Sequence, residues 1–132
     1  MSTLNVANLQ NTGSGAPVVK NSSGTEIGQF CKAWCNFQGT STVTIRDDFN
    51  VSSVTDHGTG DYTVNFSNSL GNSNHSTVFQ GSGQTNGEHC VGFLHYIRNT
   101  YSTTAVSIGF FRLNNSGNRA DQTIVTVASF GD

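Results

Sequence analysis

Residues 49–66, FNVSSVTDHGTGDYTVNF, contain the pattern that decides the fold. Over 61–66, apolar and polar residues alternate with the period of a half-buried β-strand. The first half is a shorter strand pattern that loses its alternation at Ser52 and Ser53, where we expect a β-bulge. Between the two halves, residues 56–60 include two glycines, which can adopt positive φ angles in a tight turn. The stretch therefore predicts a β-hairpin.

Strand-like patterns continue on both sides of this hairpin, at 31–37, 42–46, 76–80, 89–98, 104–113 and 122–130. The segments between them, such as 68–74 and 81–87, are polar and rich in Gly, Ser and Asn, which is typical of turns and loops. No segment shows the apolar period of an amphipathic helix. About eight strands joined by turns predict an all-β fold, an antiparallel β-sandwich or jelly-roll-like domain.

The composition agrees with ordered strands and turns. Nearly half of the 132 residues are Gly, Ser, Thr or Asn, while only 11% are charged. Disordered chains are usually rich in Pro and net charge, whereas this chain has one Pro and a net charge of -2. Lys and Arg number six and no two are adjacent, so the sequence lacks the basic patch of a nucleic-acid binder. We expect no nucleic-acid partner.

Residues 1–30 differ from the rest because they lack a sustained period and contain the single proline, Pro17. We expect an extended N-terminal anchoring arm here, with 31–132 forming the β-sandwich domain. The start of the chain has neither a basic segment nor an apolar core, so we expect no secretory signal peptide and synthesis in a cytoplasm. No apolar run is long enough to insert into a membrane. The candidate anchoring residues are Leu4, Val6, Leu9, Val18 and Val19.

The three cysteines are Cys31, Cys35 and Cys90. In an extended strand, Cys31 and Cys35 lie about 13 Å apart, from a rise of ~3.3 Å per residue. This separation is too large for a disulfide. The interpretation we favour is that all three are small apolar residues made in a reducing compartment.

The four histidines, His57, His75, His89 and His95, match no zinc-ligand spacing. On one strand, His89 and His95 share a face but lie about 20 Å apart, too far to bind one ion. We therefore expect hydrogen-bonded or surface histidines and no cofactor. A metal site built across the subunits of an oligomer is the open alternative.

A catalytic role finds little support in the sequence. Glycan cleavage needs a pair of carboxyl groups that flank a groove. Asp47 and Asp48 lie on opposite sides of a strand or in a turn, and Asp56 and Asp61 flank the hairpin turn, where Asp is common for backbone reasons. No Gly-x-Ser-x-Gly nucleophile motif occurs. We expect no enzyme activity and name no catalytic residue. For Trp34, the only tryptophan, core packing is the first interpretation and a protein interface the second.

One part of the chain resembles a known family. A block that recurs in tail-fibre and other virion proteins of marine and cyanobacterial phages is similar to AWCNFQGT at 33–40, TVTIR at 42–46, NVSSVTD at 50–56 and GTGDYTVNF at 58–66. The opening MSTLNVANLQ at 1–10 resembles the starts of such proteins. Cys35 stands where the family often has Val, and His57 stands where Asn is common.

The resemblance implies a virion protein exposed on the particle, a homotrimeric short tail fibre. Its arm would bind the phage tail, neck or another virion protein, and its domain would bind a host-surface glycan or protein. Residues 67–132 match no motif, so we expect the specificity to lie there. The candidate receptor-facing loop residues are Asn72, Asn74, Gln84, Asn86, Tyr101 and Asn115. Two alternatives remain: a capsid decoration or head-fibre protein, and a glycan-cleaving spike.

Overall fold

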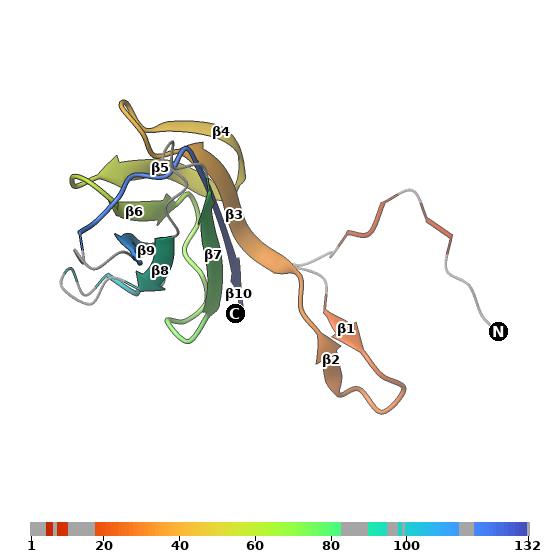
Figure 1. The fold of residues 1–132 in the computed structure, drawn as a ribbon. Helices are drawn as coiled ribbons and strands as arrows, with labels where there is room; N and C mark the ends of the chain where they lie inside the picture. Colours follow the sequence, from red (N-terminus) through yellow and green to blue (C-terminus); the bar gives the residue numbers. More distant parts are fainter. Residues whose placement is uncertain are drawn as a thin grey trace. The chain divides into compact units, whose positions relative to one another are not determined.

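The structure is a computed structural model that describes residues 5–6, 8–10, 18–82, 90–94, 98, 100–113 and 118–131. The chain divides into two compact units, Met1–Phe30 and Cys31–Asp132, and each is described by itself (Figure 1). Within the described part of the chain, no helix has the length and apolar character needed to cross a membrane.

The first unit contains a short β-hairpin, in which β1 (Val19–Lys20) pairs antiparallel with β2 (Glu26–Gly28). The Asn21 side chain organises its turn, because Oδ1 accepts hydrogen bonds from the backbone N–H groups of Ser23 (3.1 Å) and Thr25 (2.9 Å). The sequence predicts an arm without strands here. Strands of two and three residues are too short to produce a visible period, so the pattern could not reveal this hairpin.

The second unit is a β-sandwich made of two four-stranded antiparallel sheets, which confirms the predicted fold class (Figure 1). One sheet has the order β4-β3-β10-β7 and the other has the order β5-β6-β9-β8. The strands are β3 (Cys31–Gln38), β4 (Thr44–Phe49), β5 (Val51–Asp56), β6 (Asp61–Phe66), β7 (Ser76–Ser82), β8 (Cys90–Leu94), β9 (Ala105–Arg112) and β10 (Ile124–Phe130).

The hairpin predicted from residues 49–66 is confirmed as β5 and β6. The two strands pair from Val51 opposite Phe66 to Asp56 opposite Tyr62. Their register shifts between Val51 and Ser53, which is the bulge expected from the broken alternation. The connecting turn contains Gly58 and Gly60 with φ angles of 122° and 62°, so glycine is needed at both positions.

The core lies between the two sheets and is filled mainly by alternate residues of β3, β6, β9 and β10. Phe37 of β3 meets Tyr62 of β6 edge to face, with ring centroids 5.3 Å apart. Phe79 of β7 meets Phe110 of β9 in the same way at 6.1 Å. Such edge contacts add about 0.5–1.5 kcal/mol to the burial of the rings. The sandwich is therefore closed by aromatic contacts between opposite sheets.

Three predicted segments differ from the structure. The strand expected over 42–46 is β4 (Thr44–Phe49), so Phe49 ends that strand and does not begin the hairpin. Within the strand expected over 89–98, the structure describes β8 (Cys90–Leu94) and places Arg98 in a turn, while residues 89 and 95–97 lie outside the described residues. Gly81 and Ser82, which the sequence predicts to lie in a loop, are the end of β7, which pairs with β10 at seven positions. Gly and Ser are typical of loops, so the local pattern could not predict this end of the strand.

Candidate functional site

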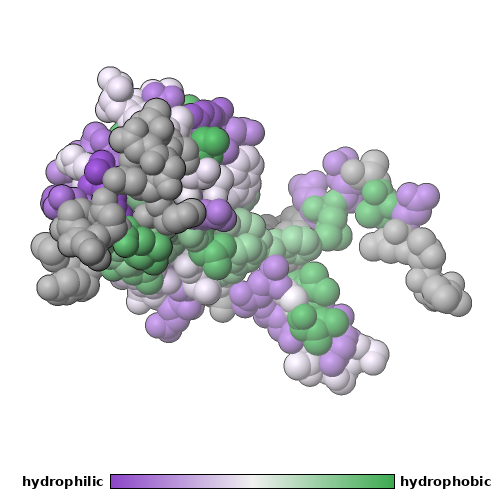
Figure 2. Space-filling view, in the orientation of Figure 1, coloured by the Kyte–Doolittle hydropathy of each residue, from purple (hydrophilic) through white to green (hydrophobic). Residues whose placement is uncertain are grey.

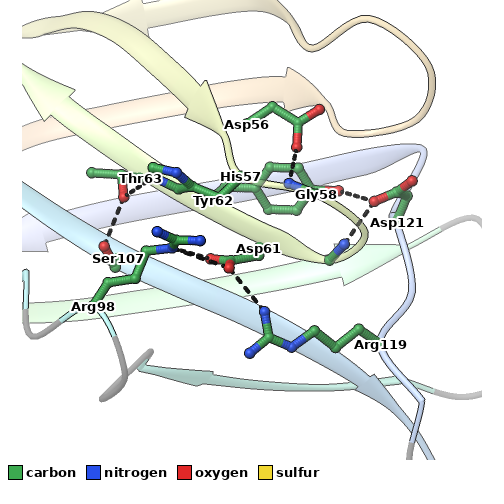
Figure 3. Close-up of polar contacts among 11 residues, drawn as sticks. Asp56, His57, Gly58, Asp61, Tyr62, Thr63, Arg98, Ser107, Arg119 and Asp121 are labelled. Atoms are coloured by element: carbon green, nitrogen blue, oxygen red, sulfur yellow. Dashed lines mark hydrogen bonds and ion pairs between the residues drawn. The ribbon is translucent and has the colours of Figure 1, made fainter.

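A group of polar side chains surrounds the β5–β6 hairpin turn and the start of β6 (Figure 3). Its centre is Asp61, which is 3% exposed. The carboxylate of Asp61 accepts a hydrogen bond from Nε of Arg98 at 3.1 Å and from Nη1 of Arg119 at 2.8 Å. A buried carboxylate is costly unless it is paired, and here two guanidinium groups compensate it. This arrangement ties two loop segments to the start of β6.

Tyr62 and Asp121 form a second part of the group, facing the interior. The Tyr62 hydroxyl lies 2.8 Å from two acceptors, the Gly39 carbonyl oxygen and Oδ1 of Asp121. The same Oδ1 accepts the backbone N–H of Gly60 at 2.7 Å. Burial raises the pKa of Tyr62 well above its ordinary value, and the hydrogen bond and charge of Asp121 raise it further. Asp121 therefore holds the hairpin turn against the far sheet.

A polar groove of about 460 Å³ opens beside this group. His57 and Thr63 line this groove, and Nε2 of His57 lies 2.9 Å from Oγ1 of Thr63. The same Thr63 oxygen lies 2.7 Å from Oγ of Ser107, which is not part of the lining (Figure 3). An imidazole next to a hydroxyl is the start of a nucleophile–base pair. However, Thr63 and Ser107 are 7% and 1% exposed, so their hydroxyls are hydrogen-bonded inside the sheet and not presented to a substrate. The other residues that line the groove are Thr55, Asn65, Arg98 and Thr100.

The carboxylates discussed at the sequence level have separate structural partners. Asp56 ends β5 and Asp61 begins β6, so the two residues flank the hairpin turn as expected from the sequence. Oδ1 of Asp56 accepts the N–H of Gly58 at 2.8 Å, a backbone role that is common for Asp beside a turn. Asp61 differs because it is buried. Asp47 and Asp48 are exposed on β4, and Oδ1 of Asp47 accepts the N–H of Asp48. In the described contacts, Asp56 and Asp47 accept backbone N–H groups, whereas Asp61 pairs with two arginines.

The second groove, of about 430 Å³, lies on the β4-β3-β10-β7 sheet. Trp34 is half-buried and lines it together with Val78 and Ala128. Backbone pairing aligns these three residues across neighbouring strands, since Ala128 of β10 lies opposite both Trp34 of β3 and Val78 of β7. Trp34 therefore lies on the outer face of β3, while Ala33 and Cys35 lie on the face toward the core. Its position fits a protein interface better than core packing.

The predicted anchoring residues that are described are all exposed. The exposed fractions of Val6, Leu9, Val18 and Val19 are 52%, 60%, 53% and 40%. Leu4 lies outside the described residues. Ile27 and Phe30, which the sequence reasoning did not select, are 63% and 42% exposed in the same unit. Figure 2 shows hydrophobic residues on the surface of the β1–β2 hairpin.

The predicted receptor-facing residues do not form one described surface. Asn74 is exposed, and its backbone N–H donates a hydrogen bond to Oδ1 of the half-buried Asn72. Tyr101 is half-buried, stacks on His75 with centroids 4.3 Å apart and donates its hydroxyl to the His75 carbonyl oxygen. Gln84, Asn86 and Asn115 lie outside the described residues.

Among the described histidines, His75 is buried and fully hydrogen-bonded. Its Nε2 donates to the Ser102 carbonyl oxygen at 3.1 Å, which leaves Nδ1 to face Oγ1 of Thr77 at 3.1 Å. No group of three metal-ligating side chains occurs within the described ranges. His89 and His95 are not among the described residues.

The cysteines are unpaired and differ in burial. Cys35 is buried in the core, while Cys31 and Cys90 are half-buried. Burial raises the pKa of the Cys35 thiol from 9.0 to about 12, and the nearby charge of Asp48 adds to this effect. Cys35 is therefore an inert core residue.

No protein-family model, curated protein or solved structure matches this chain.

Proposed function

We propose that this chain is a non-enzymatic structural protein of a phage particle, a short fibre subunit that mediates attachment to the host surface. The first unit would bind the tail, the neck or another virion protein. The sandwich would assemble as a homotrimer and contact a host glycan or protein. The resemblance of residues 33–66 to phage virion proteins supports this assignment.

The observation that carries the proposal is the exposed apolar surface of the first unit. Val6, Leu9, Val18 and Ile27 are each more than half exposed. Short β-hairpins are marginal in water unless they pack on another structure. Because isolated side chains of this kind gain about 1.5–3 kcal/mol each when fully buried, the unit has a strong tendency to dock. A virion partner supplies the surface that this segment needs.

The polar residues of the sandwich support a binding role over catalysis. Asp61, Asp121 and Asp56 bond to arginines or to the backbone, and Ser107 is buried. Attachment does not need reactive groups. Weak contacts repeated around a symmetric fibre can raise overall affinity by about 10²–10⁴.

Adsorption competition tests this proposal. Purified protein added to host cells should reduce the fraction of phage that adsorbs, and light scattering should give the mass of a trimer. A monomer at micromolar concentration that leaves adsorption unchanged would contradict the fibre assignment. Protein that binds to the capsid lattice in place of cells would identify a decoration protein.

A further inference from the structure

The outer face of the β4-β3-β10-β7 sheet has an unusual order of side chains. Register places Phe49, Trp34, Ala128 and Val78 in one row that crosses all four strands. Phe49 and Val78 are 53% and 58% exposed. The hollow of about 430 Å³ lies where this row contains its smallest side chain, Ala128, between Trp34 and Val78. The indole therefore forms one wall of a groove that is open to solvent.

The next row supplies hydrogen-bonding groups. Asn36, Thr126 and Gln80 lie side by side in register and line the same groove. Asn36 uses its Oδ1 to accept from Arg46 at 3.2 Å, which leaves its NH₂ group pointing to no described partner. The side chains of Thr126 and Gln80 make no hydrogen bond within the described part of the chain. An apolar wall thus stands beside three polar groups that are available to a ligand.

The charges in and around the groove indicate which kind of ligand it could hold. Its lining residues are all uncharged. Of the neighbouring charged residues, Arg46 is engaged by Asn36 and Gln38 and donates to the Thr123 carbonyl oxygen at 2.7 Å. Lys32, two positions before Trp34 on the same face of β3, and Asp47, opposite Asn36, lie beside the groove and outside its lining. The uncharged lining therefore matches a neutral occupant, and the two bordering charges are of opposite sign.

We propose that this groove binds a neutral hexopyranose of a surface glycan, with the sugar ring stacked on Trp34. A pyranose presents C–H groups on one face and hydroxyls around its rim. The C–H groups can stack on the indole of Trp34. The hydroxyls can form hydrogen bonds with the side chains of Asn36, Thr126 and Gln80. Ligand sites commonly have this volume and combine apolar walls with a few polar groups. A second copy of the chain would fit less well, because an apolar surface would bury those polar groups unpaired.

This inference rests on the proposed attachment function and names the site and the ligand class. Because Trp34 is the only tryptophan, its fluorescence reports on this groove alone. Full-length protein is titrated with methyl β-D-glucopyranoside, methyl β-D-galactopyranoside and methyl α-D-mannopyranoside, with polygalacturonate as the anionic comparison. At least one neutral probe should change the emission and saturate, with a dissociation constant on the order of 1 mM.

Three variants identify the groove. Ala128→Leu fills the hollow, and Gln80→Leu removes a polar group at an exposed position where folding is not at risk. Each should weaken binding by roughly tenfold or more, as expected for the loss of a stacking or hydrogen-bonding contact. Ser82→Leu adds the same side chain at an exposed site farther along β7 and should leave binding unchanged.

Four results would contradict the proposed sugar site. No emission change with any neutral probe up to about 50 mM would overturn the inference, since even weak sugar sites saturate there. A response to polygalacturonate alone would also overturn it. Emission that depends on protein concentration, together with a lower mass for Ala128→Leu in light scattering, would assign the face to self-association. Cell binding that persists in Ala128→Leu would refute this site while leaving the attachment function in place.

Discussion

The hydroxyl group of Tyr62 on β6 reaches the opposite sheet, where it contacts the backbone at Gly39. A Cβ atom at Gly39 would lie 2.6 Å from that hydroxyl, so only glycine permits the contact. We predict that Tyr62→Phe lowers the free energy of unfolding by about 1–3 kcal/mol, because the Gly39 carbonyl loses its side-chain donor in a buried site. Urea unfolding measures this change. Tyr101→Phe, at a half-buried hydroxyl, is the control and should cost less.

The same hydroxyl makes stability depend on alkaline pH. The native pKa of Tyr62 is raised above its ordinary value of 10.0, so the stabilisation is complete below about pH 10. As pH rises further, the unfolded chain ionises and the native chain does not, so the free energy of unfolding falls. Tyr62→Phe should fall less steeply than wild type in this range. Parallel curves for the two proteins would contradict the assignment.

Cys35 should be protected from thiol reagents in the native protein. Its pKa of about 12 leaves almost no thiolate at about pH 8, and its side chain is buried. We predict that iodoacetamide modifies Cys31 and Cys90 first, as read by peptide mass spectrometry. Denatured protein should react at all three positions alike. Native Cys35 that reacts as fast as Cys31 would show that the core is open.

Among the elements, the β5–β6 turn depends on Gly60 for two reasons. Its φ angle is 62°, and an added Cβ would lie 2.8 Å from backbone atoms of Ala120 and Phe110. Gly58 also has a positive φ of 122°, but nothing lies within 4 Å of its Cβ position.

We predict that Gly60→Ala destabilises the sandwich by about 2–4 kcal/mol, since steric overlap with backbone adds to the cost of the positive φ angle. Gly58→Ala, the matched control, lacks the overlap and should cost less. Thermal unfolding compares the two variants. Equal losses would mean that the close approach of the Ala120 segment contributes nothing.

The element scale also shows what the sequence could and could not predict. The β5–β6 hairpin and its bulge follow from local alternation, because neighbouring residues decide them. The ion pairs of Asp61 with Arg98 and Arg119 join residues 37 and 58 positions away, so no local pattern contains them. The groove beside Trp34 depends on Ala128 and Val78 lying in register on two other strands. Only the strand order reveals that alignment.

For the whole molecule, the division at residue 30 predicts independent stability of the sandwich. Its core consists of residues from within Cys31–Asp132. A fragment of residues 31–132 should therefore unfold at the same urea midpoint as the full chain, while losing incorporation into particles. Circular dichroism and particle sedimentation measure the two properties. A large drop in midpoint would show that the first unit stabilises the sandwich.

The function could be proposed from the sequence only through the resemblance to a known family. Composition and strand pattern predict the sandwich, yet they fit attachment, decoration and many other roles equally well. The exposed apolar residues of the first unit and the groove beside Trp34 are the two surfaces on which our proposals of binding rest.

Cryo-electron microscopy of purified phage particles, with this chain located and counted, is the direct test of the fibre assignment. The fibre assignment predicts density at the tail or neck in a few three-fold copies, with the sandwich exposed to solvent. Density spread over the capsid lattice in many copies would contradict host attachment and would make the chain a decoration protein. Absence of the chain from the particle would refute the virion assignment altogether.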